Sequence, residues 1–250
     1  MSKLKIGIDI NEILRAIWLQ FDRYYYQEYG LEGIPSEQLY TYDFFNTYTW
    51  NRTKEKTLVL KDDFPEDISP EFYAIDENGK SLADAFLFNT ENVDLSEKET
   101  YNKFMYEDYL FEIFGSAPFM YKGLDLDLKN FLYKYKDYID VTIFSVENVH
   151  SIPPTLFFLS RIMSRFSTYK FLDRSTDIID DIDVDIIITT DPELLNSELA
   201  KKYKTLIKVK RPYNVNMCPD TKEILQLADL IDDAEFEKLI NYKKEENVGE

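Results

Sequence analysis

The sequence predicts an α/β protein that is built on a parallel sheet and interrupted by an inserted subdomain. From residue 118 onward, apolar strand-like runs alternate with helix-like stretches, which is typical of a parallel sheet with helices on both faces. A further apolar run, Leu4 to Ile10, opens the chain. Between these two parts the pattern changes: residues 50–99 hold 13 acids and 6 bases. The 250 residues suffice for a core with an insertion of this kind.

The first elements are a short strand and a long helix. Leu4 to Ile10 is rich in β-branched residues, as buried parallel strands are, and contains Asp9 near its carboxyl end. The pattern then predicts a helix over Glu12–Tyr29, which Gly30 ends in the position of a helix stop.

Residues 31–104 are expected to form an acidic, aromatic-rich cap. Pro65, Pro70 and the pair Asn78-Gly79 divide this stretch into short pieces, and Asn-Gly is a strong hairpin-turn signal. The core is then made of residues 1–30 and 105–250.

Strands and helices resume after the cap. The helices are expected at Tyr101–Phe114, Leu124–Lys136, Pro154–Phe166 and Pro192–Tyr203, and the strands at Val141–Ser145, Tyr169–Leu172, Val184–Ile188 and Leu206–Val209. In such a sheet the strand ends at Asp9, Ser145 and Thr189 meet at the carboxyl edge, where open α/β sheets bind ligands.

Three segments at these strand ends resemble the motifs of the haloacid dehalogenase superfamily. The first is Ile8-Asp9-Ile10-Asn11, the second is Ile143-Phe144-Ser145, and the last is the run from Asp185 to Leu195. The last motif, with Pro192-Glu193, is similar to that of the 5′(3′)-deoxyribonucleotidases, and the resemblance covers residues 3–30 and about 105–232. It implies a Rossmann-type parallel sheet with an inserted cap.

The resemblance also implies roles for single residues. Asp9 matches the nucleophile that forms an aspartyl-phosphate, and Ser145 matches the phosphate-binding hydroxyl. Asn11 stands where the family has an acid/base Asp, and an amide does not exchange a proton near neutral pH. Thr189 and Thr190 replace the paired acids that hold Mg²⁺, and Asp191 follows one position late. If the site is active, Asp9 and Asp191 are the expected metal ligands.

The family's phosphate-binding lysine has no clear counterpart. Lys208, Lys210 and Arg211 form a small basic cluster near the last strand, which is interpreted either as a residual anion site or as ordinary pairing with nearby acids.

Composition and charge limit the classes of partner that the protein is expected to bind. A net charge of −18 argues against direct binding of nucleic acid, and no apolar run has the length of a membrane helix. The amino-terminal residues run into a strand and not into a signal peptide, so a cytoplasmic or virion-associated location is expected. The 19 Tyr and 18 Phe fit either an AT-rich genome or a protein interface.

Three functional hypotheses follow. The first is a non-catalytic structural or interaction protein with protein partners and no cofactor, for example a bacteriophage virion component in a large assembly. The second is a Mg²⁺-dependent 5′-nucleotidase or phosphomonoesterase that uses Asp9. The third is a sensor that binds a nucleotide or phosphate without turnover.

Overall fold

The computed structural model describes residues 3–30, 43–50, 54–60, 86–92, 95–162, 166, 168–173, 183–196 and 205–246. The chain divides into two compact units, Met1–Phe44 with Met105–Glu250, and Phe45–Phe104. The cap boundaries at 31 and 104 stay predictions, because residues 31–42 and most of 51–94 lie outside the described residues. The turn predicted at Asn78-Gly79 lies there as well.

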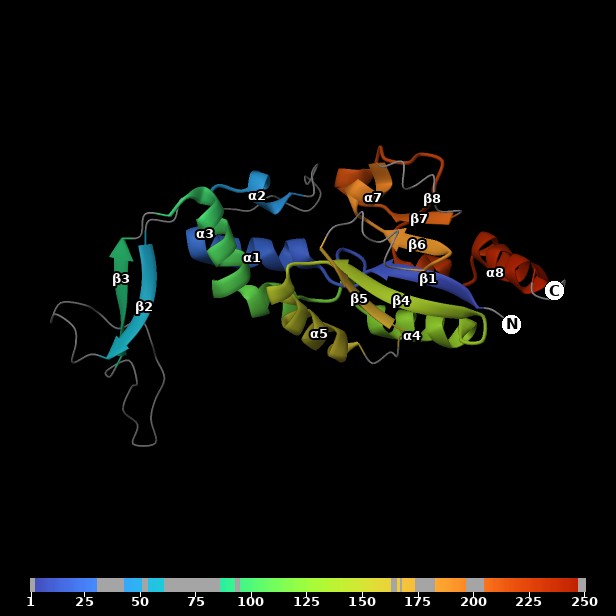
Figure 1. The fold of residues 1–250 in the computed structure, drawn as a ribbon, viewed down its shortest axis with the longest axis horizontal. Helices are drawn as coiled ribbons and strands as arrows, with labels where there is room; N and C mark the ends of the chain where they lie inside the picture. Colours follow the sequence, from blue (N-terminus) through green and yellow to red (C-terminus); the bar gives the residue numbers. More distant parts are fainter. Residues whose placement is uncertain are drawn as a thin grey trace, which may run out of the picture. The chain divides into compact units, whose positions relative to one another are not determined.

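The first unit is built on a six-stranded sheet in which every neighbouring pair is parallel (Figure 1). The strand order is β5-β4-β1-β6-β7-β8. The bounds are β1 Leu4–Asp9, β4 Ile139–Val146, β5 Thr168–Leu172, β6 Ile186–Thr189, β7 Thr205–Val209 and β8 Lys222–Ile224.

This order places a topological switch point between β1 and β6. The chain adds β4 and β5 on one side of β1 and then resumes with β6 on the other side. Ligands of open α/β sheets bind beyond the carboxyl ends of the strands at such a point. Asp9 and Thr189 end the two strands that flank it.

Helices cover both faces of this sheet. The helices of the first unit are α1 Ile17–Tyr29, α4 Leu124–Tyr135, α5 Ile152–Arg161, α7 Pro192–Asn196 and α8 Ala234–Glu246. Apolar side chains of α4, α5 and α8 pack with alternate residues of the strands in one large core. Leu194 and Leu195 of α7 pack with Phe144 and Ile187 in a smaller core. Among the described residues, no helix has both the length and the apolar character needed to cross a membrane.

The second unit contains an antiparallel pair and an aromatic cluster. Strands β2 Lys54–Leu60 and β3 Phe86–Asn92 pair along their whole length. Helix α3 Glu97–Lys103 begins with a capping box between Ser96 and Glu99, and the short α2 Phe44–Thr47 lies at the unit boundary. Trp50 packs against Tyr101 and Phe104 at ring-centroid distances of 5.1 and 5.5 Å.

The first predicted helix was wrong at its start. The helix begins at Ile17 and not at Glu12, because Glu12 takes a left-handed conformation with φ of 56°. A turn forms instead, in which the amide N–H groups of Leu14 and Arg15 both donate to the carbonyl of Ile10. Arg15 therefore lies in the loop between strand and helix.

The single helix predicted over Tyr101–Phe114 was also wrong. The chain continues from α3 through two π-helical turns, η4 Phe104–Asp108 and η5 Phe111–Gly115. Such turns insert an extra residue per turn, which a search for a 3.6-residue period misses. Helix α5 ends at Arg161, five residues before the predicted end, and residues 197–203 lie outside the described part of the chain.

Candidate functional site

Asp9 is a buried carboxyl group at the switch point. Thr189 Oγ1 donates to Asp9 Oδ2 at 3.1 Å, and the Asn11 amide N–H donates to Oδ1 at 3.2 Å. Burial, together with the negative charge of Asp191, raises the pKa of Asp9 to about 8. This shift favours the protonated form of Asp9, which is a poor nucleophile.

Asn11 is fixed in one orientation by its neighbours. Its side-chain oxygen accepts two hydrogen bonds from Arg15, at 3.1 Å from Nε and at 2.6 Å from Nη2. Its side-chain nitrogen donates to Ser145 Oγ at 3.3 Å. The structure thus brings Asn11 and Ser145 into contact at the carboxyl edge, where the sequence predicted that the strand ends meet.

Arg15 is completely buried and makes five hydrogen bonds. Besides the two bonds to Asn11, it forms an ion pair with Glu147 and donates to the Phe114 carbonyl at 2.8 Å and to Thr155 Oγ1 at 2.7 Å. Because a guanidinium carries five N–H groups, each of them has an acceptor. The ring of Phe114 lies 5.2 Å from its central carbon, within cation–π range.

Glu147, two residues beyond Ser145, is the counter-ion of Arg15. Its Oε1 accepts from Arg15 and, at 2.8 Å, from Ser145 Oγ. Its Oε2 accepts from Thr155 Oγ1 at 2.6 Å and lies 3.1 Å from Ser151 Oγ, whose proton also faces a backbone carbonyl. Arg15 and Glu147 therefore form a buried ion pair whose remaining polar atoms are bonded, the condition under which such a pair is tolerated.

Charged groups also hold the loop after β1. The Glu12 carboxylate accepts the Trp18 amide N–H at 3.0 Å at the start of α1, and burial raises the pKa of Glu12. Arg211 Nε donates to the Glu12 carbonyl at 3.1 Å. This contact ties the residue with the left-handed conformation to the segment after β7.

The remaining motif positions also bond within the protein. Thr190 Oγ1 donates to the Asn11 carbonyl at 3.1 Å, and Asp191 N–H donates to Thr189 Oγ1 at 2.9 Å. Asp191 Oδ1 accepts the Glu193 amide N–H at 2.8 Å in the first turn of α7. Each group named for the family's metal site thus has a partner within the protein.

This donor set is poorer in acids than the Mg²⁺ site that the resemblance implies. Thr189 and Thr190 carry no charge, so Asp9 and Asp191 are the carboxyl groups that remain at the motif positions, where the family has further acids. Within the described ranges, no three His, Cys, Asp or Glu side chains come together as a metal-binding group.

The basic cluster is not an open anion site. Lys208 is fully buried, pairs with Glu223 at 2.7 Å and donates to the Met217 carbonyl at 2.6 Å. The guanidinium of Arg211 donates to backbone carbonyls. The interpretation as pairing with nearby acids holds for Lys208 and Lys210, which both pair with Glu223. Lys208 is buried and not at the surface, however, and Arg211 bonds to backbone carbonyls instead.

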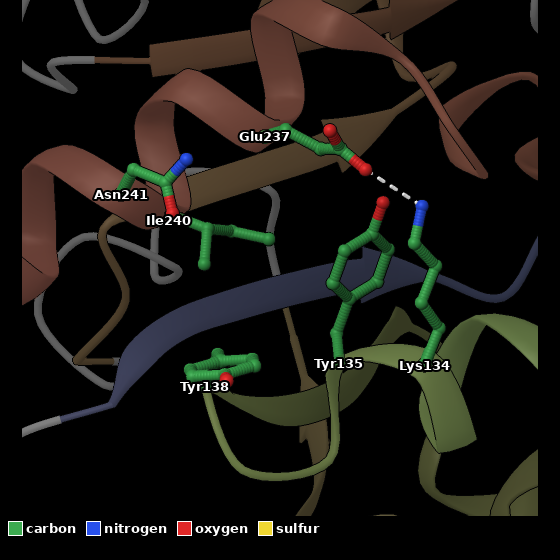
Figure 2. A pocket seen from close by; sticks show the side chains of 6 residues that line it. All are labelled: Lys134, Tyr135, Tyr138, Glu237, Ile240 and Asn241. Carbon is green, nitrogen blue, oxygen red and sulfur yellow. Dashed lines mark hydrogen bonds and ion pairs between the residues drawn. The ribbon is translucent and has the colours of Figure 1, made fainter.

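A small cavity lies at the opposite edge of the sheet (Figure 2). Its volume is about 190 Å³, and it lies between the end of α4 and the side of α8. Tyr138 in its lining precedes β4, whose first residue pairs with Leu4 at the start of β1. The cavity is therefore separate from the site at Asp9. It is lined by Lys134, Tyr135, Tyr138, Glu237, Ile240 and Asn241.

Arg15 and Glu147 were not among the site residues predicted from the sequence. One signal was present for the first of them: Arg15 is the only charged residue in the apolar run Ile13–Trp18. A cation in such a run is rarely buried unless it is paired. Its partner could not be found in the same way, since Glu147 is 132 positions away and is followed by the exposed residues 148–150.

The comparisons with known proteins identify the fold. No protein-family model and no curated protein matches the chain. The chain is similar to the solved structure of a protein from Burkholderia xenovorans LB400 assigned as a haloacid dehalogenase-like hydrolase, with 12% identity and a TM-score of 0.51. The match covers 94% of this chain and 99% of the other. The chain thus has a haloacid dehalogenase-like fold, which confirms the predicted fold class, while the narrower resemblance to deoxyribonucleotidases stays a prediction.

Proposed function

We propose that this chain uses its haloacid dehalogenase-like fold as a non-catalytic interaction or structural protein. The observation that carries the proposal is the contact of Ser145 and Arg15 with Glu147. The hydroxyl and the cation next to Asp9 and Asn11 are both bound to a carboxylate of the protein itself.

This arrangement disfavours the binding of a phosphate group. The charges of Arg15 and Glu147 cancel, so the position beside Ser145 offers no net positive charge. Two like charges 4 Å apart repel by about 4 kcal/mol at an effective dielectric constant of 20. A phosphate held by Ser145 would meet that repulsion from Glu147, and would also compete for the hydroxyl.

Proton transfer is also impaired. General acid–base catalysis contributes ~10²–10⁴-fold to a rate, and the amide of Asn11 cannot supply it. The two bonds from Arg15 hold the Asn11 oxygen, so the amide nitrogen faces Ser145. The side chain thus acts as a connector in the buried network.

The surface of the protein suits protein partners better than anionic partners. The charge of −18 disfavours anionic partners such as nucleic acid. Phe111 and Phe157 are nearly half exposed and lie 4.9 Å apart between ring centroids, on η5 and α5. Exposed aromatic pairs are common at protein interfaces. The more specific proposal, a bacteriophage virion component, rests on composition.

A phosphatase assay tests the proposal. The wild type is expected to hydrolyse deoxynucleoside monophosphates in the presence of Mg²⁺ no faster than Asp9→Asn does. Asp220→Asn, a change at an exposed acid, controls for handling of the variants. Equal residual rates in all three proteins would identify contamination.

A Mg²⁺-dependent rate that is lost in Asp9→Asn and kept in Asp220→Asn would overturn the proposal in favour of a phosphomonoesterase. One observation favours that rival: the charge of Asp191 acts on Asp9, so two acids lie near each other at the switch point. Calorimetry with deoxynucleoside monophosphates tests the third hypothesis, a sensor that binds a nucleotide or phosphate without turnover. Heat of binding without turnover would show a sensor.

A further inference from the structure

The donors around the Glu147 carboxylate form a binding site in their own right. Arg15 provides a buried cation, and the hydroxyls of Ser145 and Thr155 point at the carboxylate at 2.8 and 2.6 Å. A cation with two or three converging hydroxyls is what a protein offers to a bound oxyanion.

Each hydroxyl is oriented by a second hydrogen bond. Ser145 Oγ accepts from the Asn11 amide, and Thr155 Oγ1 accepts from Arg15 Nη1 at 2.7 Å. An oxygen that accepts on one side presents its proton on the other, so both protons are directed at Glu147. Asn11 and Arg15, the donors that orient these two hydroxyls, both come from the loop after β1.

We infer that Arg15, Ser145 and Thr155 form an oxyanion site whose occupant in the native chain is the carboxylate of Glu147. The inference rests on the proposed function, in which no external anion is bound beside Asp9 and the protein's own carboxylate can occupy the site. The ligand class of the site is a small monocarboxylate.

The geometry defines the matching probe. Substitution of Glu147 by alanine removes two carbons and two oxygens, which are the heavy atoms of acetate. In Glu147→Ala the cation remains buried without its counter-ion, which is strongly destabilising. Acetate that enters the vacated volume restores both the charge and the hydrogen bonds.

The test is the melting temperature of Glu147→Ala in acetate. At 100 mM acetate, we expect a rise of roughly 5 °C over the value in chloride at equal ionic strength, since a ligand that binds only the folded state stabilises it. Acetamide, a neutral molecule of similar shape, is expected to have no such effect.

Glu147→Gln is the matched control. It removes the same charge but keeps the volume filled, so acetate has no place to bind and its melting temperature is expected to be the same in acetate and chloride. Ser145→Ala in the Glu147→Ala background is expected to reduce the acetate effect at least by half.

If Glu147→Ala does not fold in chloride, its refolding yield from urea replaces the melting temperature, with recovery expected in acetate and not in acetamide. The inference is overturned if neither quantity responds to acetate, or if Glu147→Gln responds equally. Neither result depends on phosphatase activity, so the proposed function can survive a failure of this inference.

Discussion

Replacing Arg15 by methionine is expected to lower the free energy of unfolding by about 3–5 kcal/mol. The substitution leaves Glu147 as an uncompensated buried charge, and it removes donors from Asn11 and from the Phe114 carbonyl. Urea unfolding followed by far-UV circular dichroism measures the loss as a lower midpoint at an unchanged slope.

The paired variant Arg15→Met with Glu147→Leu separates charge from shape. Replacing a whole buried ion pair by apolar residues of similar volume is often neutral or stabilising. The double variant is therefore expected to recover most of the lost free energy. A single variant within about 1 kcal/mol of the wild type would contradict the assignment of Arg15 as the centre of the network.

Replacing Asp9 by asparagine is expected to stabilise the protein at pH 8 by about 1–4 kcal/mol. Between about pH 4 and pH 8 the folded chain holds a proton on Asp9 that the unfolded chain has released, because burial and Asp191 raise the pKa of Asp9 to about 8. The stability from this group is complete below the unfolded pKa and is lost as the pH rises towards 8. The asparagine side chain does not titrate in this pH range, so Asp9→Asn does not lose this stability as the pH rises.

Melting temperatures from pH 5 to pH 8.5 measure this effect. The advantage of Asp9→Asn over the wild type is expected to grow with pH, and Asp220→Asn is expected to follow the wild type. Parallel curves for the wild type and Asp9→Asn would show that Asp9 is already ionised in the folded protein at pH 5.

Buried parallel strands could be predicted from the sequence because such strands are apolar on both faces. Ile186–Thr189 and Thr205–Val209 are almost entirely buried, and they lie close to the predicted positions. The edge strand β8 was not predicted, since its three residues include Lys222 and Glu223. Short, charged strands are common at sheet edges and carry little sequence signal.

The meeting of Asp9, Ser145 and Thr189 at one edge also followed from the pattern, because parallel strands place their carboxyl ends together. The buried hydrogen-bond network around them could not be predicted in this way. Helical periodicity extended the first helix back to Glu12, whereas the tertiary contacts of Arg211 and Trp18 with Glu12 stabilise a turn there. An ion pair between distant segments exists only after those segments have packed, so no local pattern contains it.

The two tryptophans of the chain belong to different units, and this makes each unit visible by its own fluorescence. Trp18 is buried in the first unit and stacks on Phe44 at 3.9 Å, whereas Trp50 is buried among the aromatic rings of the second. In a Trp50→Phe background the emission reports only the unit that contains Asp9 and Arg15. The unfolding of each unit can thus be followed by intrinsic fluorescence, without an added label.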